Sequence, residues 1–332
     1  MQKIAIIALI VFVLSACTKH EAQYITNKGA IFGTYYYMVY ETPEGENLQT
    51  EIDELLHTFN GSLSTYYKES VISKINSNTP VVPDSFFITV FNRALEISEI
   101  THGAFDPTVA PLVNAWGFGF TKKEQVTPEL IDSIKAFTGY HLINIEDGKI
   151  VKKDERVMLD YSAIAKGYGV DVVGNFLKEK GCENFMVDIG GEVVAQGVNK
   201  EGNIWRIGIN QPNDNEYTSQ SKLQAIVNLE NKAIATSGDY RNFYIENGKK
   251  YAHTIDPKTG YPINHNILSA SVIADDCITA DAYATAFMVM GVEKSIEMVK
   301  QIDEVEVYLI SSGADGEFKV TATEGFKKYL QE

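Results

Sequence analysis

Residues 160–167, with the sequence Asp-Tyr-Ser-Ala-Ile-Ala-Lys-Gly, combine charged and hydroxyl side chains at the start of a predicted helix over residues 163–178. Asp160 and Ser162 could cap the N-terminus of this helix, where unpaired N–H groups and the helix dipole favour anions. Lys166 would lie in the first turn, where the same dipole makes a cation unfavourable. A bound pyrophosphate would reverse that effect. The segment therefore indicates phosphate binding, although it lacks the P-loop pattern.

A second candidate site lies at residues 280–286, with the sequence Ala-Asp-Ala-Tyr-Ala-Thr-Ala. Asp281 and Thr285 are four residues apart, so they share one face of a predicted helix over residues 280–290. A carboxylate and a hydroxyl are hard oxygen donors of the kind that Mg²⁺ prefers, and the alanines leave room for close approach. The alternative is a capped, solvated helix start in which Asp281 is only a first-turn anion.

Two loops could complete such a site. Residues 103–108, Gly-Ala-Phe-Asp-Pro-Thr, contain the proline and glycine of an irregular backbone, which suits ligand contact, although a purely structural loop is the alternative. Residues 253–262 place His253 beside a tight turn at 256–260, where proline sets φ and glycine permits positive φ. Because histidine titrates near neutral pH, His253 could accept a hydroxyl proton, and a structural histidine is the alternative.

The overall charge limits the classes of ligand. The chain has 332 residues, 45% of them hydrophobic, and a net charge of −15 with a pI near 4.9. Such an acidic chain lacks the clustered Lys and Arg that nucleic-acid binding requires. A protein of this charge that binds a phosphorylated ligand must supply positive charge locally, and a divalent metal is one way to do so.

The N-terminus resembles a bacterial lipoprotein signal. Lys3 precedes an apolar run over residues 4–14, and Leu-Ser-Ala-Cys follows at 14–17. About eleven apolar residues are too few for a permanent membrane span but suit a signal peptide. We expect residues 1–16 to be removed, Cys17 to carry lipid, and residues 17–28 to form a tether. An ordinary secretory signal with an incidental cysteine is the alternative.

The two remaining cysteines, Cys182 and Cys277, could form a disulfide in an oxidising compartment, or stay unpaired as small buried residues, which we favour. The rest of the chain mixes strand-like and helix-like segments without regular alternation, so an α+β fold is predicted. Helices are predicted over 48–60, 85–102, 163–178 and 280–290, and strands over 35–41, 185–189, 205–209, 224–229, 232–237 and 305–310.

Eight segments, in order along nearly the whole chain, resemble the ApbE family of FAD:protein FMN transferases. They are Phe-Gly-Thr at 32–34, Leu-Ser-Thr-Tyr at 63–66, GAFDPTVAPLVNAWGFG at 103–119, DYSAIAKGYGVD at 160–171, DIGGE at 188–192, ATSGDY at 235–240, HTIDPKTGYP at 253–262 and CITADAYATA at 277–286. The resemblance implies one ApbE-type α+β domain over residues 29–332, with mixed sheets and T-fold-like α/β subdomains.

The resemblance also implies site residues. His253 matches the family's base. The Mg²⁺ ligands would be Asp281, Thr285 and the carbonyls of Ala163 and Ala284. Phe32 stands where the family usually has methionine in a Met-Gly-Thr motif, so flavin packing would keep an apolar contact of altered shape. The expected FAD contacts are Phe32, Tyr66, Ala104, Phe105, Asp106, Asp160, Lys166 and Ile255.

The implied reaction is Mg²⁺-dependent transfer of FMN from FAD to a threonine hydroxyl of an acceptor protein, through a phosphoester bond, with release of AMP. The acceptor would be a subunit of a membrane redox complex, and lipid on Cys17 would hold the enzyme beside it on the periplasmic side, at the inner membrane. An FAD pyrophosphatase that releases FMN and AMP is the nearest alternative. A flavin-binding lipoprotein without catalysis is the other, and it would need neither His253 nor the Asp281–Thr285 pair.

Overall fold

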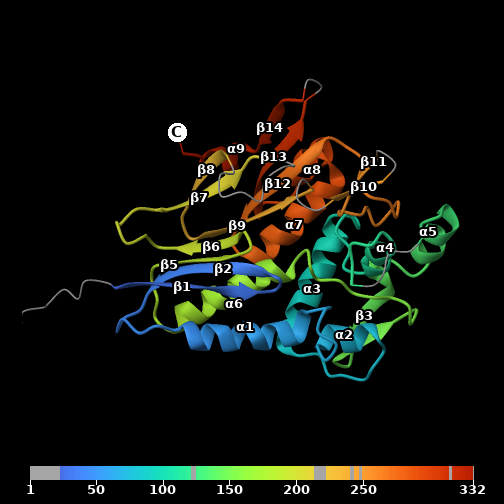
Figure 1. The fold of residues 1–332 in the computed structure, drawn as a ribbon, viewed down its shortest axis with the longest axis horizontal. Coiled ribbons are helices and arrows are strands. Elements are labelled where there is room, and N and C mark those ends of the chain that lie inside the picture. The colour runs from blue at the N-terminus through green and yellow to red at the C-terminus, as the bar shows by residue number, and fades with distance from the viewer. Residues whose placement is uncertain are drawn as a thin grey trace, which may run out of the picture.

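An antiparallel sheet runs through the molecule, with strand order β1-β2-β5-β6-β9-β12-β13-β14 (Figure 1). The structure is a computed structural model, and it describes residues 23–120, 125–212, 222–239, 243–246, 249–313 and 316–331. The strands are β1 (Tyr24–Ile31), β2 (Thr34–Glu41), β5 (Phe185–Ile189), β6 (Glu192–Gln196), β9 (Lys232–Gly238), β12 (Ile267–Ala274), β13 (Val305–Ser312) and β14 (Phe318–Ala322).

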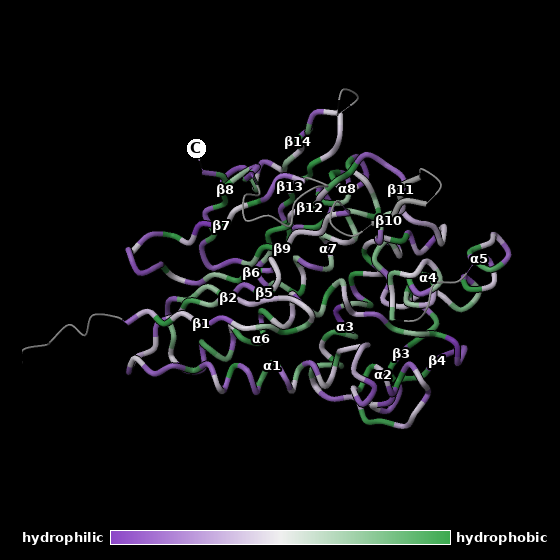
Figure 2. Tube along the Cα trace, in the orientation of Figure 1, coloured by the Kyte–Doolittle hydropathy of each residue, from purple (hydrophilic) through white to green (hydrophobic). Residues whose placement is uncertain are grey.

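Successive residues of the central strands pack on opposite faces of the sheet, as the two-residue period of a strand requires. On β9, Ala233 and Ala235 belong to the main core, whereas Ile234 belongs to a second core on the other face. The main core is covered by α1 (Gln49–Leu63), α3 (Ser85–Ile100), α6 (Ala165–Glu179), α7 (Cys277–Met290) and α8 (Val292–Val299). The second core is covered by a hairpin of β7 (Trp205–Asn210) and β8 (Leu223–Leu229) and by α9 (Glu324–Lys327). Figure 2 shows hydrophobic residues along the central strands, whereas α1 is mainly hydrophilic.

A smaller lobe extends beyond the helices and forms its own core. Trp116 packs there with Ile131 and Ile255, and its Nε1 donates a hydrogen bond to the Gly260 carbonyl at 2.8 Å. This contact fixes the loop that carries His253 against the lobe. The short elements outside the main layers are α2 (Val71–Asn76), α4 (Ala110–Ala115), α5 (Pro128–Lys135), a 3-10 turn (Tyr140–Leu142), and the hairpins β3 (Ile143–Glu146) with β4 (Lys149–Lys152) and β10 (Phe243–Glu246) with β11 (Lys249–Ala252).

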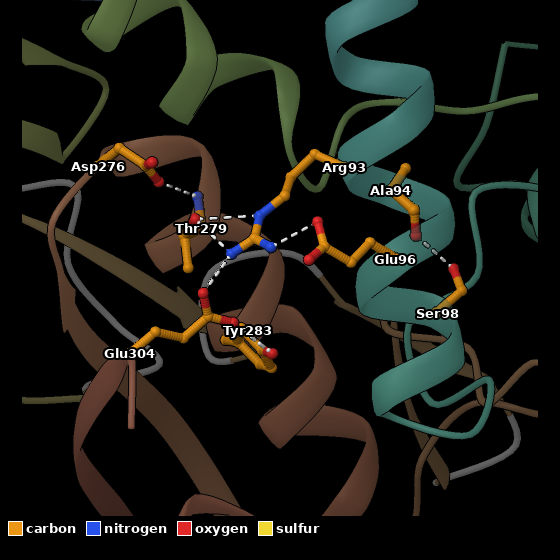
Figure 3. Close-up of polar contacts among 8 residues, drawn as sticks. All are labelled: Arg93, Ala94, Glu96, Ser98, Asp276, Thr279, Tyr283 and Glu304. Carbon is orange, nitrogen blue, oxygen red and sulfur yellow. Dashed lines mark hydrogen bonds and ion pairs between the residues drawn. The ribbon is translucent and has the colours of Figure 1, made fainter. Parts of the chain in front are cut away.

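Arg93 fastens α3 to the start of α7 (Figure 3). Its guanidinium donates from Nε and Nη2 to the Thr279 hydroxyl, at 3.2 and 2.8 Å. The same group pairs with Glu96 and Glu304, both at 2.7 Å. Burial disfavours the charge, but the two carboxylates outweigh it and raise the pKa of Arg93. The cluster therefore orients α7, the helix that carries Asp281 and Thr285.

Asp171 of α6 caps the first turn of α7 from outside that helix. Its two carboxylate oxygens accept hydrogen bonds from the backbone N–H groups of Cys277 and Ile278, both at 2.8 Å. Asp276, the N-cap residue, accepts the next N–H, from Thr279, at 3.1 Å. Three of the four unpaired donors at this helix end are thus satisfied by carboxylates. These bonds join α6 to the N-terminal end of α7.

This cap predicts a pH dependence of stability. Burial raises the pKa of Asp171 from its ordinary value of 3.8 to about 7, against backbone hydrogen bonds that lower it. The folded protein therefore keeps a proton that the unfolded chain releases between those values. The stability from Asp171 is complete below about pH 4 and is lost as the pH rises toward 7, by up to about 1.4 kcal/mol per pH unit. The free energy of unfolding, measured with urea at several pH values between about 5 and 7, should fall less steeply with pH for Asp171→Asn than for the parent. Equal slopes would exclude this contribution.

The structure confirms the α+β fold class and the helix and strand positions predicted from periodicity, within a few residues at the ends. It corrects two details. Residues 24–28, expected in the tether, form part of β1, where Asn27 is buried and accepts a hydrogen bond from the Tyr40 hydroxyl at 2.5 Å. Asp160 and Ser162 do not cap α6, because its N-cap residue is Ile164, which makes no side-chain cap bond. Cys182 and Cys277 are both buried free thiols, in agreement with the unpaired alternative.

The predicted signal peptide and Cys17 lie outside the described residues. Among the helices that the structure describes, none has the length and apolarity to cross a membrane.

Candidate active site

Most of the predicted site residues line a single cavity of about 440 Å³. It is bounded by the loop before α6, the end of β9, the segment from His253 to Pro257 and one side of α7. The predicted residues that line it are Tyr66, Ala104, Phe105, Asp106, Asp160, Ala163, Lys166, His253, Ile255, Asp281 and Thr285. Residues up to 219 positions apart, Tyr66 and Thr285, are thus brought to one place by the sheet and by the α6–α7 contact.

Among the predicted FAD and Mg²⁺ contacts, Phe32 and Ala284 do not line this cavity. Ala284 is fully buried within α7. Phe32 lines an adjoining cavity of about 690 Å³, which shares Tyr66, Asp160 and Lys166 with the first. Since these three residues face both spaces, one extended ligand could occupy the two cavities together.

Phe32 is held in an unusual backbone conformation. It has φ of 53° and Gly33 has φ of 75°, so the two residues form the tight turn between β1 and β2. Positive φ is uncommon for an aromatic residue, and such strain tends to occur at functional sites. The ring packs against Phe59, at 5.3 Å between centroids, and against Gly169, where an added Cβ would come within 2.9 Å of it. The position of Phe32 is therefore fixed by α1 and α6.

Lys166 lies in the first turn of α6, as predicted, and pairs with a buried carboxylate. Its Nζ lies 2.5 Å from Oε1 of Glu192, a residue only 3% exposed. Burial opposes the charge on Lys166, but Glu192 and Asp281 outweigh it and raise the pKa of the lysine. Burial also raises the pKa of Glu192 to about 7, although Lys166 lowers it in part. A single cation thus stands between two buried carboxylates at the wall of the cavity.

Asp281 is 3% exposed and lies in the second turn of α7, so the alternative of a solvated first-turn anion is wrong. Its Oδ2 accepts the backbone N–H of Gly167 at 3.0 Å. Thr285 contacts the Ser237 hydroxyl at 3.1 Å. Burial raises the pKa of Asp281, and Lys166 partly offsets this. A buried carboxylate that faces a cavity beside a hydroxyl is a setting that a bound cation would stabilise.

Three of the four predicted Mg²⁺ ligands have suitable oxygen atoms at the cavity, and the fourth, Ala284, is not supported. Asp281, Thr285 and Ala163 line the cavity and offer hard oxygen atoms, whereas Ala284 does not line it. In the part of the chain that the structure describes, no three His, Cys, Asp or Glu side chains form a metal cluster. A set with one carboxylate would need backbone oxygens, water or a ligand's phosphate oxygens to complete it, which is common for Mg²⁺.

Gly167 allows the close contact between α6 and α7. A Cβ at this position would lie 2.2 Å from the Cys277 carbonyl oxygen and 2.7 Å from the Asp281 Cβ. Because both belong to a buried helix, neither can move aside cheaply. Gly167→Ala should destabilise the protein by about 1–3 kcal/mol through overpacking, measured by urea unfolding. Gly61→Ala is the matched control, since nothing lies within 4 Å of a Cβ there. Equal stability of the two variants would contradict the close-contact account.

Asp106 organises the loop at 103–108. Its carboxylate accepts hydrogen bonds from the Thr108 N–H at 2.8 Å, the Thr108 hydroxyl at 2.6 Å and the Tyr140 N–H at 2.9 Å. Burial raises its pKa, and these bonds oppose the shift in part. The Pro107 carbonyl in turn accepts the Asp160 N–H at 2.8 Å, which joins this loop to the segment before α6. Asp106 therefore holds the cavity wall in shape.

His253 faces the cavity from the loop after β11, and its ring pairs with Asp239. The Nδ1 atom lies 3.0 Å from Oδ1 of Asp239, and the hydroxyl of Thr254 donates to that same oxygen at 2.6 Å. The His253 side chain is 37% exposed and that of Asp239 10%. A partly exposed imidazole held by a carboxylate is a common arrangement for a general base.

Glu192, Ser237 and Asp239 belong to the site but were not predicted as site residues. All three fall in segments that resemble the family, at 188–192 and 235–240. The resemblance therefore pointed to these segments but did not assign a role to the three residues. A signal existed for Glu192, since this charged residue directly follows two glycines, opens β6 and is followed by three apolar residues.

The α+β fold, with a lysine at a helix N-terminus and oxygen donors around one cavity, defines an enzyme class that handles a phosphorylated ligand. The chain belongs to the ApbE family, whose model matches residues 32–309. This confirms the resemblance drawn from the ordered segments.

Relatives and solved structures agree with this assignment. Two curated relatives are each named FAD:protein FMN transferase. The one from Vibrio cholerae is 40% identical over 98% of both chains, and the one from Haemophilus influenzae is 38% identical over 96% of this chain and 94% of its own. The flavin transferase ApbE from Vibrio cholerae superposes with a TM-score of 0.83, at 39% identity, over 93% of this chain and 100% of that chain. The apo form of Pseudomonas stutzeri flavinyl transferase ApbE superposes with a TM-score of 0.83, at 31% identity, over 93% of this chain and 97% of that chain.

Proposed function

We propose that this chain transfers FMN from FAD to a threonine hydroxyl of an acceptor protein, with Mg²⁺, and releases AMP. The observation that carries the proposal is the convergence of Lys166, Asp281 and His253 on one cavity. The relatives' name, FAD:protein FMN transferase, supports the substrate and the transferred group. The choice of threonine rests on the family resemblance.

Binding of the pyrophosphate falls to the start of α6. Lys166 has three N–H donors, one of which is directed at Glu192, so the others can reach ligand oxygens. Mg²⁺ held by Asp281, Thr285 and the Ala163 carbonyl would neutralise phosphate charge. Phosphoryl-type transfer depends mainly on such positioning and charge neutralisation.

The transfer itself forms one P–O bond and breaks another. The threonine Oγ bonds to the phosphorus of the FMN half, and the bond from that phosphorus to the bridging oxygen breaks. AMP leaves with the bridging oxygen and the bonding electron pair. His253 takes the threonine proton and later releases it to solvent. Phe32 and Tyr66, which border the adjoining cavity, would contact the rest of FAD.

The acceptor and the location follow from the same proposal. A lipid on Cys17 would anchor the enzyme to a membrane outside the cytoplasm, near an acceptor that is a subunit of a membrane redox complex. Residues 17–23 would then form the link to β1, since β1 begins at Tyr24.

The test is the mass of an acceptor protein after incubation with the chain, FAD and Mg²⁺. The proposal predicts an FMN adduct that maps to one threonine and is absent from the Thr→Val acceptor. Free FMN and AMP with an unmodified acceptor would instead establish an FAD pyrophosphatase.

A further inference from the structure

The carboxylate of Asp239 is buried but is not fully used by the hydrogen bonds around it. Asp239 is buried, and its Oδ1 accepts hydrogen bonds from His253 and from Thr254. Its Oδ2 is buried without a hydrogen-bond partner among the described residues. A buried carboxylate with one orphaned oxygen is costly and calls for an explanation beyond the anchoring of a loop.

The position of Asp239 is set by the sheet. The residue directly follows β9, and its backbone N–H donates to the Leu268 carbonyl of β12 at 3.3 Å. His253 and Thr254 come from the loop after β11, which forms no part of that sheet. The carboxylate is therefore a fixed point against which the more exposed imidazole is oriented.

The contact at Nδ1 decides which ring nitrogen can act as the base. A carboxylate accepts hydrogen bonds, so Nδ1 must carry the proton and Nε2 becomes the proton-accepting atom. The same carboxylate also stabilises the imidazolium that forms once Nε2 takes a proton. A hydroxyl or an amide in place of Asp239 could fix the Nδ1–H tautomer only in part, and it would hardly stabilise the imidazolium because it carries no charge.

We propose that Asp239 is a positioning residue for transfer: it holds His253 in the Nδ1–H tautomer and stabilises its protonated form, so that Nε2 accepts the acceptor's hydroxyl proton. This rests on the proposed function, in which His253 is the base. The other charged groups that line the cavity with His253 are Asp106, Asp160, Lys166, Glu192 and Asp281. The pair at Nδ1 is formed with Asp239.

The first experiment is a cycle of variants assayed for FMN transfer. Asp239→Asn keeps the size of the side chain and removes its charge, and kcat should fall by about 10²-fold or more, as expected when a base loses its orienting carboxylate. The KM for FAD should change by less than about threefold, because Asp239 does not line the cavity. In a His253→Ala background, Asp239→Asn should cause no further loss, because its effect acts through the imidazole.

Thr254→Val is the matched control. It removes the second hydrogen bond to Oδ1 and leaves the pair between Asp239 and His253 in place. Its transfer rate should fall far less than that of Asp239→Asn. If Thr254→Val and Asp239→Asn lost activity equally, the role of Asp239 would be to hold the loop, and the inference would be wrong.

The second experiment reads the tautomer directly. The chain has six histidines, so ¹⁵N labelling of the rings gives few signals to assign. The Nδ1–H form of His253 should dominate in the parent and in Thr254→Val, and should decrease in Asp239→Asn. An unchanged tautomer in Asp239→Asn would overturn the inference. Full transfer by His253→Ala would overturn both the base assignment and the inference, whereas an impaired His253→Ala beside an unimpaired Asp239→Asn would overturn the inference alone.

Discussion

Asp281→Asn is expected to lower metal-dependent FMN transfer by about 10²–10³-fold and to leave the protein folded. The carboxylate is the one charged member of the proposed Mg²⁺ ligand set, and a metal supplies several kcal/mol of charge stabilisation in such reactions. Asparagine keeps an oxygen that can accept the Gly167 N–H, now received by Asp281 at 3.0 Å. Since burial raises the pKa of Asp281, a neutral amide should be tolerated in the apo protein. The measurement is the rate of transfer against Mg²⁺ concentration, with urea unfolding on the same samples.

Asp276→Ala is the control for this prediction. It removes the N-cap of the same helix, which should cost about 1 kcal/mol of stability, and it leaves the cavity untouched. Transfer at saturating Mg²⁺ should therefore persist in Asp276→Ala and collapse in Asp281→Asn. Normal turnover by Asp281→Asn, with an unaltered requirement for Mg²⁺, would show that the metal ligands have been assigned wrongly.

Lys166→Met should reduce both activity and stability, and the two effects should separate in a double variant. The substitution leaves Glu192, now 2.5 Å from Nζ, buried without its cation. Removing one partner of a buried pair costs about 3–5 kcal/mol. The expected loss here is smaller, about 2 kcal/mol, because the Lys166 side chain is 33% exposed and Glu192 can take up a proton. The rate of FMN transfer should fall by about 10²-fold, because the ammonium group that would bind the pyrophosphate is lost.

Lys166→Met combined with Glu192→Gln removes both charges. The double variant should recover most of the stability, since replacement of a whole buried pair is often neutral. It should not recover transfer, because the lysine that would bind the pyrophosphate is still missing. Urea unfolding and transfer assays on the parent, the single variants and the double variant measure the two effects. Recovery of transfer in the double variant would show that Lys166 serves only to neutralise Glu192.

Much of the fold could be predicted from local patterns because periodicity reports which face of an element is buried. The predicted helix over 85–102 and the predicted strand over 185–189 correspond to α3 and β5. Two of the missed strands, β12 and β1, lack such a pattern. β12 is buried on both faces, so Ser269 and Ser271 sit among apolar residues without alternation. In β1, the polar residue Asn27 occupies a buried position. Its side chain accepts a hydrogen bond from the Tyr40 hydroxyl, and this contact cannot be read from the pattern of the strand itself.

The candidate site, like the fold, was only partly predictable from local sequence patterns. Lys166 and the Asp281–Thr285 pair could be chosen from residue chemistry, since each is a group in an unexpected place on a helix. Their grouping in one cavity, and the choice of a base over a structural histidine at His253, required the family resemblance. Glu192 and Asp239 were not predicted as site residues, because their function depends on partners that lie 26 and 14 residues away in the sequence and meet them only in the folded protein.

The most direct test of the account is the balance of products from FAD in the presence of an acceptor protein and Mg²⁺. The central claim is that the threonine hydroxyl, held near His253, receives FMN in place of water. Transfer to threonine predicts one AMP released for each FMN bound to the acceptor, with free FMN close to background and no FMN bound to a Thr→Val acceptor. Free FMN formed in equal amount to AMP, whether or not the acceptor is present, would contradict it.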